Sequence, residues 1–232
     1  MGNVGSSATE SSALEGILAA LPDQALHRIH ALCAKNDTQL RKPHPDAPPA
    51  YPAVSRGVAV TLDTDAAHEA LKLVPRLQQK HHEMIPRFVN ELAFFVNFFS
   101  HFTVIVQEAA PNLLARNGEY TWRGDASDDA GVTAFTNMWS SLGQDEREAI
   151  KGLADPLNDA LMTFNQSSPQ PFPPIAFGMR CFIDTKWCES SLINVPGLQR
   201  KFGKLVPGKL DERNFWMNFS THLTSIVGLV ES

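Results

Sequence analysis

Cysteine is scarce in this chain, and its scarcity limits the chemistry that the sequence can support. The three cysteines among 232 residues are Cys33, Cys181 and Cys188, an odd number whose spacing matches neither a zinc-binding motif nor a disulfide framework. We therefore expect three free thiols in a reducing compartment.

An excess of basic charge and a signal for export are also lacking. The formal net charge is −5, whereas a nucleic-acid-binding protein normally carries excess positive charge, so we expect no nucleic-acid partner. The first residues contain neither the basic nor the apolar region of a secretory signal, and we expect that the chain is not exported.

No long uninterrupted apolar run is present. The longest apolar stretch, 92–106, is interrupted by Asn97, Ser100, His101 and Thr103. It is also shorter than the roughly 20 residues that a membrane-spanning helix needs. It therefore predicts a buried helix rather than a membrane segment.

Patterns typical of catalytic and metal sites are missing too. The sequence has no glycine-rich phosphate loop and no nucleophile elbow. Of the eight histidines, His101 and His222 fall on apolar helical stripes and are expected to be hydrogen-bonded at the edge of a core. His81, next to Lys80, is expected on a solvated face. We expect no enzyme activity, no catalytic residue, no metal and no cofactor.

What the sequence does contain is a tandem duplication. Adding 121 to a residue number in the first half reaches a matching residue in the second half, as for Val74 and Val195 or Pro75 and Pro196. Each copy has roughly 100 residues, a normal domain size. We predict a flexible tail, a first repeat, a linker and a second repeat over 1–12, 13–108, 109–134 and 135–232.

Both repeats begin with a helical segment and end with their most regular helix. The last helix of the first repeat carries extra apolar groups at Leu92, Val96 and Phe99, where the second repeat has Arg213, Met217 and Ser220. A helix that is apolar nearly all round is buried nearly all round. We expect the other repeat, the leading helix or a partner to cover this second face, so these three residues form a candidate apolar interface.

The second repeat resembles the BSD domain, a small three-helix module of transcription factors and synapse-associated proteins. The resemblance is carried by Phe182-Ile183-Asp184, Leu205-Val206-Pro207, Glu212 and Phe215-Trp216-x-x-Phe219, whereas Phe95 replaces the tryptophan in the first repeat. It implies an all-α fold with two tandem three-helix bundles, each preceded by an additional helical segment. The BSD-like bodies would span 57–106 and 178–230, act in protein interactions, and have as core residues Phe94, Phe95, Phe98, Phe215, Trp216 and Phe219.

The first residues fit a lipidation pattern. Met1-Gly2-Asn3-Val4-Gly5-Ser6 matches the acceptor sequence for N-myristoylation on Gly2. One myristoyl chain binds membranes only weakly and reversibly, so stable attachment needs a second signal.

A basic run in the second repeat is a candidate for that signal. It comprises Arg200, Lys201, Lys204, Lys209 and Arg213. Each basic residue near an anionic membrane contributes about 1 kcal/mol. The alternative is that these residues form an ordinary solvated face or contact a protein partner.

The sequence thus predicts a cytoplasmic adaptor, peripheral to a membrane, with an unidentified protein partner and the two repeats packing together. A structural subunit of a cytoskeletal, ciliary or flagellar assembly is the alternative. A nuclear, transcription-linked BSD factor is a third hypothesis, which rests on the resemblance alone.

Overall fold

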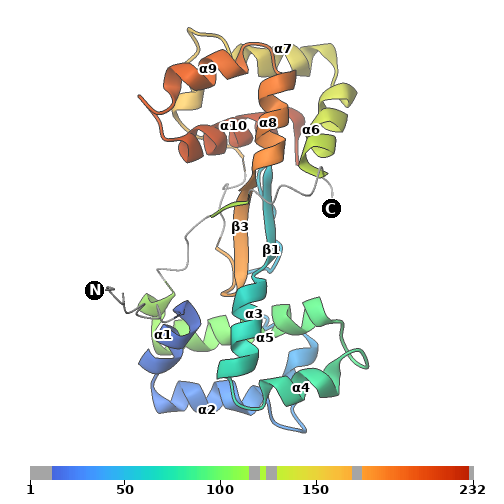
Figure 1. Cartoon of the computed structure of the whole chain (residues 1–232), viewed down its shortest axis with the longest axis vertical. Coiled ribbons are helices and arrows are strands. Elements are labelled where there is room, and N and C mark those ends of the chain that lie inside the picture. The colour runs from blue at the N-terminus through green and yellow to red at the C-terminus, as the bar shows by residue number, and fades with distance from the viewer. Residues whose placement is uncertain (1–11, 115–120, 124–129, 169–173, 230–232) are drawn as a thin grey trace, which may run out of the picture. The chain divides into compact units, whose positions relative to one another are not determined.

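The computed structural model describes residues 12–114, 121–123, 130–168 and 174–229, and this part of the chain is mostly helical (Figure 1). The prediction of a helical protein is confirmed, and a small sheet is added to it. Gly2 and most of the predicted tail lie outside the described residues.

The chain divides into two compact units that are not contiguous in sequence. Among the described residues, unit 1 comprises 12–50, 62–114 and 176–179, and unit 2 comprises 51–61, 121–123, 130–168, 174–175 and 180–229. Each unit therefore incorporates a short segment from the other repeat. The predicted repeats, 13–108 and 135–232, miss this exchange, because no local feature of the sequence shows which unit a connecting segment packs against.

Unit 1 consists of helices whose ends the sequence marks. They are α1 (Ala13–Ala20), α2 (Asp23–Leu32), η1 (Gln39–Arg41), α3 (Thr64–Leu73), α4 (Leu77–Met84), α5 (Glu91–Ala109) and η2 (Pro111–Leu113). The side chains of Ser12, Asp63 and Asn90 accept backbone N–H groups at the starts of α1, α3 and α5.

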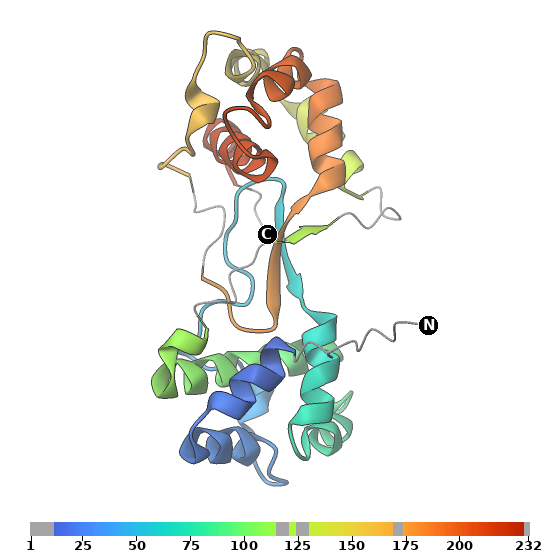
Figure 2. The ribbon, with the colours of Figure 1, turned by 60° about the vertical axis from the view of Figure 1, so that its left-hand side comes forward.

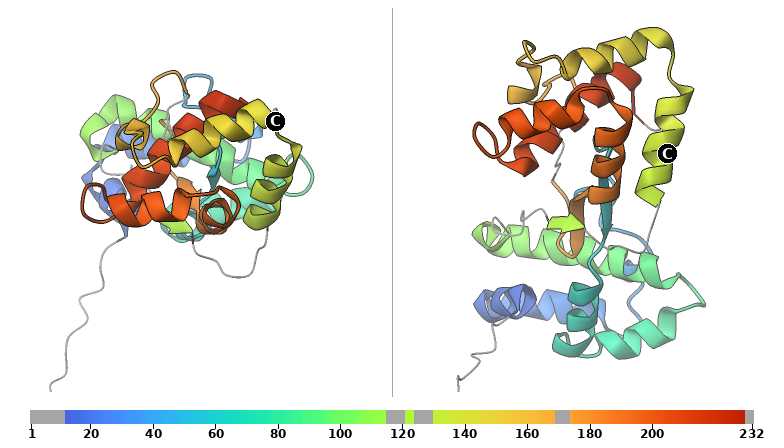
Figure 3. Two further views of the ribbon diagram at one scale, coloured as in Figure 1. Left: turned by 90° about the horizontal axis from the view of Figure 1, so that it is seen from above. Right: turned by 45° about the horizontal axis from the view of Figure 1, so that its top comes forward.

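Unit 2 repeats this order. Its helices are α6 (Ala130–Ser141), α7 (Gln144–Leu153), η3 (Ala160–Met162), α8 (Thr185–Asn194), α9 (Leu198–Leu205) and α10 (Glu212–Val227). The first residues of α3, α4 and α5 and those of α8, α9 and α10 are 121 positions apart. Within unit 2, α6 packs along α8 (Figures 1 and 3).

The sheet has three strands, β1 (Val58–Leu62), β2 (Thr121–Arg123) and β3 (Met179–Asp184), in the order β1-β3-β2. Strand β2 lies parallel to β3, with Trp122 opposite Ile183 (Figure 2). The predicted linker, 109–134, thus contains η2, β2 and the first residues of α6.

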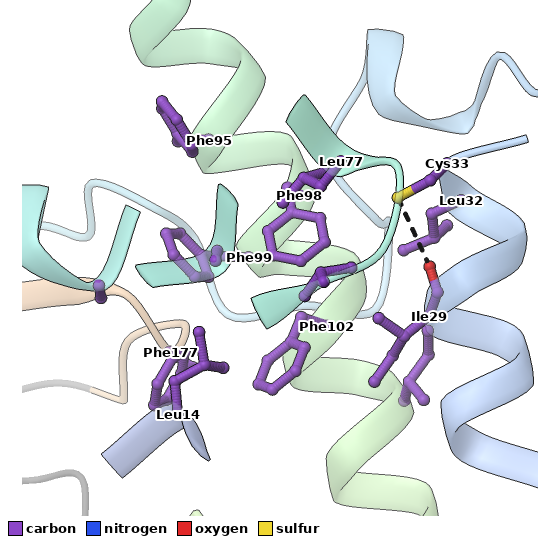
Figure 4. Close-up of a cluster of buried hydrophobic side chains, with 14 of the residues drawn as sticks. Leu14, Ile29, Leu32, Cys33, Leu77, Phe95, Phe98, Phe99, Phe102 and Phe177 are labelled. Atoms are coloured by element: carbon purple, nitrogen blue, oxygen red, sulfur yellow. Dashed lines mark hydrogen bonds between the residues drawn. The ribbon is translucent and has the colours of Figure 1, made fainter. Parts of the chain in front are cut away.

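Helix α5 is the centre of the unit 1 core. Phe98, Phe99 and Phe102 are fully buried along it (Figure 4). Helix α2 packs against α5, and Phe177 from the second repeat lies against Phe99 and Phe102, with ring centroids 5.7 and 5.2 Å away. Both the leading helical segment and the other repeat therefore cover the helix.

By length and composition alone, α5 would be long enough to cross a membrane. Its most apolar window is 67% buried inside the protein. It is therefore accounted for as a core helix, in agreement with the interrupted apolar run from 92 to 106.

Candidate functional site

The polar residues of α5 and α10 bind the loops of their own units. The amide nitrogen of Asn97 donates to the backbone oxygen of Leu40 at 2.9 Å, and that of Asn218 donates to the backbone oxygen of Leu161 at 2.8 Å. Both asparagines are buried. Because a buried amide without a partner is costly, these bonds explain why both repeats have asparagine here.

The two equivalent histidines have the same structural role. His101 Nε2 lies 3.2 Å from the backbone oxygens of both Gln39 and Lys42, and His222 Nε2 lies 3.0 Å from that of Thr163. Burial lowers the pKa of His101, so its neutral form is favoured at neutral pH. Its ring lies 5.0 Å from that of His44.

The interpretation of Lys201 as a surface contact is wrong. Lys201 is 3% exposed, and its ammonium donates to the backbone oxygens of Asp155 (at 2.8 Å) and Asn158. Lys80 does the same in unit 1, donating to Ala34 and Asp37 at 2.7 Å each. Both lysines fasten a loop after the leading helices, so neither belongs to a solvated face.

His81 also lies on a less solvated face than the sequence suggests. It takes the position of Phe202 in unit 2, and its ring packs edge-on against Phe94 at 5.1 Å. Phe202 packs in the same way against Phe215 at 5.0 Å. The imidazole thus takes the place of a partly buried aromatic residue that packs against the core.

The six aromatic residues that the BSD resemblance predicts to be core residues lie inside the two units. All are at most 3% exposed, and Phe215 and Trp216 pack edge to face at 5.1 Å, as Phe94 and Phe95 do at 5.4 Å. Phe98 and Phe219 are fully buried. None of these side chains is available for contact with a partner.

The three cysteines are buried and free. Burial raises the pKa of Cys33 to about 11 and that of Cys181 to about 12, and it raises the pKa of Cys188 well above its usual range. Thiolate is the reactive form, so these thiols are poor nucleophiles. In the part of the chain that the structure describes, no group of His, Cys, Asp and Glu could hold a metal ion.

The exchanged segments enter their units through equivalent hydrogen bonds. The N–H of Phe177 donates to Thr103 Oγ1 in unit 1, and the N–H of Arg56 donates to Thr224 Oγ1 in unit 2, both at 2.8 Å. The glycine that follows each of them, Gly57 or Gly178, adopts a positive φ. These contacts are structural: each unit holds the incoming segment by a hydrogen bond from a backbone N–H to a threonine hydroxyl, followed by a glycine with positive φ.

The exposed faces of the units, in contrast, differ. The other four residues of the basic run lie in α9 or follow it. Arg200, Lys204 and Lys209 are exposed, and Arg213 is half-buried. Their counterparts in unit 1 are Gln79, Glu83, Phe88 and Leu92.

Two aliphatic side chains that the sequence analysis missed flank this helix. Leu157 is 92% exposed in the loop after α7, and Ile193 is 82% exposed near the end of α8. We name Leu157, Ile193, Arg200, Lys204 and Lys209 together the α9 face. A comparison of each repeat with the other would have drawn attention to it, because Asn36 and Lys72 stand where Leu157 and Ile193 do.

Unit 1 has an exposed apolar patch of its own. Leu92 is 47% exposed and Val96 is half-buried, whereas Phe99 is fully buried, so Phe99 does not belong to an open interface. Phe88, which the sequence analysis missed, is 44% exposed, and the Arg41 guanidinium lies 4.2 Å from its ring centre. We name Phe88, Leu92 and Val96 the α5 patch.

In comparisons with family models, with curated proteins and with solved structures, the chain matches none. The resemblance to the BSD domain therefore stays a prediction, and the functional proposal rests on the surfaces of the two units.

Proposed function

We propose that this chain is a non-enzymatic adaptor of two BSD-like helical units, tethered reversibly to a cytoplasmic membrane face by a myristoyl group on Gly2. The α9 face of unit 2 contacts anionic lipid, and the α5 patch of unit 1 binds a protein partner. Membrane attachment and partner binding then reside in different repeats.

One observation carries this proposal: the repeats agree in their buried polar contacts and differ on their exposed faces. Asn97 and Asn218, or Lys80 and Lys201, make the same bonds inside both units. At the surface, Gln79 and Glu83 of α4 are answered by Arg200 and Lys204 of α9. Residues required by the fold stay alike in a duplication, whereas binding surfaces are free to diverge.

The membrane part is tested by sedimentation with vesicles. Co-translationally myristoylated protein and its Gly2→Ala variant are mixed with phosphatidylcholine vesicles, with and without phosphatidylserine, at low and high salt. We expect binding that needs both Gly2 and phosphatidylserine and that weakens with salt. Absence of binding in every condition, or equal binding by the Gly2→Ala variant, would contradict the tether.

A subunit of a large cytoskeletal or ciliary assembly is the second candidate, and the exposure of Phe88 and Leu92 favours it. The double variant Phe88→Lys, Leu92→Arg gives unit 1 the equivalent residues of unit 2, Lys209 and Arg213. An adaptor should be monomeric by light scattering with or without these changes. Self-association of the unaltered chain that the double variant abolishes would favour the assembly subunit instead.

A further inference from the structure

We infer that Leu157 and Ile193 insert into the lipid of an anionic membrane while Arg200, Lys204 and Lys209 contact its headgroups. This inference rests on the proposed membrane tether and on lipid contact by the α9 face, and it adds to them the insertion of two aliphatic side chains into the bilayer. Leu157 and Ile193 are the most exposed of the large hydrophobic residues that the structure describes, at 92% and 82%.

The fold itself does not require aliphatic residues at these two places. Unit 1 builds the same loop with Asn36 and the same helix end with Lys72. The polar residues are the ordinary solution for an exposed site, because apolar side chains gain nothing from exposure to water. Leucine and isoleucine therefore point to an apolar surrounding that the isolated unit does not provide.

Both side chains border the same short helix. Lys204 Nζ lies 3.4 Å from the backbone oxygen of Pro156, the residue before Leu157. At the other end of α9, Ile193 and Arg200 line one shallow depression together with Pro196. The loop after α7 thus places Leu157 near Lys204, and the end of α8 places Ile193 near Arg200.

The α9 face carries three exposed positive charges, those of Arg200, Lys204 and Lys209. Glu148 of α7 and Glu189 of α8 are paired with Lys151 and Lys186, at 2.7 and 3.1 Å, and Asp211 caps the start of α10. The carboxylate of Asp155 accepts the backbone N–H of Leu157 at 2.7 Å and so fixes the turn that carries this leucine. Within the described residues, Arg200, Lys204 and Lys209 have no carboxylate partner, and they are free to meet lipid phosphates.

A membrane suits this arrangement better than an acidic protein does. A protein partner gains affinity from a continuous, shape-complementary contact, whereas Leu157 and Ile193 are separate side chains on two segments. Each can enter the interfacial region of a bilayer independently, as apolar groups of peripheral proteins do. Two such insertions and three basic residues strengthen the membrane binding given by one acyl chain, which alone is only marginal.

The test uses the full-length myristoylated protein and phosphatidylcholine vesicles with and without phosphatidylserine. Leu157→Asn with Ile193→Asn removes the aliphatic groups. Leu73→Asn in unit 1, where the second repeat has Asn194, is the matched control for loss of an exposed aliphatic side chain. We expect the double variant to bind anionic vesicles about tenfold or more weakly with its salt dependence unchanged. The control should bind as the unaltered protein does.

A second readout follows the side chain itself. Ile193→Cys is labelled with an environment-sensitive fluorophore, and the buried native thiols should react far more slowly than this exposed one. We expect a blue shift of the label on addition of anionic vesicles. An acidic polypeptide serves as the competing ligand.

The outcomes separate this inference from the proposed function. If the unaltered protein binds vesicles and the double variant binds equally well, insertion is refuted and the tether stands. If a vesicle-bound label stays in water, the inference is overturned. If only the acidic polypeptide shifts the label, the inference is also overturned and the α9 face binds protein instead. If the unaltered protein binds no vesicle, both proposals are refuted.

Discussion

The exchange of segments predicts that a substitution in one repeat destabilises the unit formed mainly by the other repeat. Gly57 and Gly178 have φ angles of +79° and +75°. A Cβ on Gly57 would lie 2.5 Å from the Trp187 ring in unit 2, and one on Gly178 would lie 2.3 Å from the Phe99 ring in unit 1. Gly57→Ala should therefore destabilise unit 2 although it is a change in the first repeat, and Gly178→Ala should destabilise unit 1.

The magnitude has two parts. A left-handed backbone costs a residue other than glycine about 1 kcal/mol, and forcing an extra group into a well-packed core costs about 1–3 kcal/mol. Both rings are almost completely buried and cannot swing into solvent. We expect a loss of about 2–4 kcal/mol for each variant, from these two terms.

The assay exploits the position of the tryptophans. All four, Trp122, Trp139, Trp187 and Trp216, belong to unit 2, so their fluorescence follows that unit during urea unfolding, while circular dichroism follows both. Gly57→Ala should lower the midpoint of the fluorescence transition, and Gly178→Ala should lower only the dichroism transition of unit 1. A control, Gly203→Ala, changes an unobstructed helical glycine and should stabilise unit 2 by about 0.5–1 kcal/mol. If Gly178→Ala shifts the fluorescence transition and Gly57→Ala does not, the exchange is refuted.

Four further predictions concern single side chains. Trp216→Ala should cost about 3–5 kcal/mol of unfolding free energy in unit 2, measured by dichroism; a folded variant of unchanged stability would contradict its place in the core. Lys201→Met should cost about 1–3 kcal/mol because two backbone oxygens lose their donor, whereas exposed Lys204→Met should change stability little in the same urea titration. Native protein at pH 8 should react slowly with a thiol reagent and rapidly once unfolded, since burial raises the pKa of all three cysteines; three fast thiols in the folded state would disprove this. The unfolding free energy of unit 1 should fall as the pH drops below 6.5, because the pKa of His101 is lowered in the folded state and the unfolded state binds the proton more readily. His101→Gln should reduce this pH dependence. An unchanged dependence would assign it to other groups.

Local signals in the sequence mark several of the helices. Aspartate and asparagine at 63, 90, 184 and 211 cap helices that apolar residues at helical spacing then extend. The duplication was equally visible, because the same pattern recurs at a constant offset. These features depend on residues close together in the chain.

The location of the connecting segments could not be predicted in this way. The residues 51–61 and 176–179 contain no local signal for the unit they join, since that choice depends on how they fit side chains remote in sequence such as Thr103 and Thr224. Lys201, in contrast, was misjudged although a signal existed. It lies between Leu198 and Leu205 on the buried side of α9, and the first repeat has lysine in the equivalent place.

The α9 face and the α5 patch were only partly predictable. Their basic and apolar residues could be identified from the sequence, but the exposure of Leu157 and Phe88 depends on how the loops turn, and that of Ile193 on how the last turn of α8 packs. Periodicity alone gives no information on side chains in irregular segments. Only the other repeat, with a polar or charged residue at each of these positions, indicates that they are unusual.

The same comparison explains why the exchange is specific. The ring beneath the glycine is Phe99 of α5 in unit 1 and Trp187 of α8 in unit 2, and the equivalent positions, Ser220 and Ala66, are small. Each unit therefore provides one large ring, but from a different helix.

The residue before each glycine fits only the unit that it enters. Phe177 packs between Phe99 and Phe102, whereas the guanidinium of Arg56 donates to the backbone oxygens of Gly228 (at 2.7 Å) and Leu229 at the end of α10. Without the exchange, Arg56 would enter the phenylalanine pocket and lose these acceptors, and a buried guanidinium without partners is strongly unfavourable. The phenylalanine would in turn offer no donor to the carbonyls of Gly228 and Leu229. These mismatched pairs disfavour the unexchanged arrangement of the two segments.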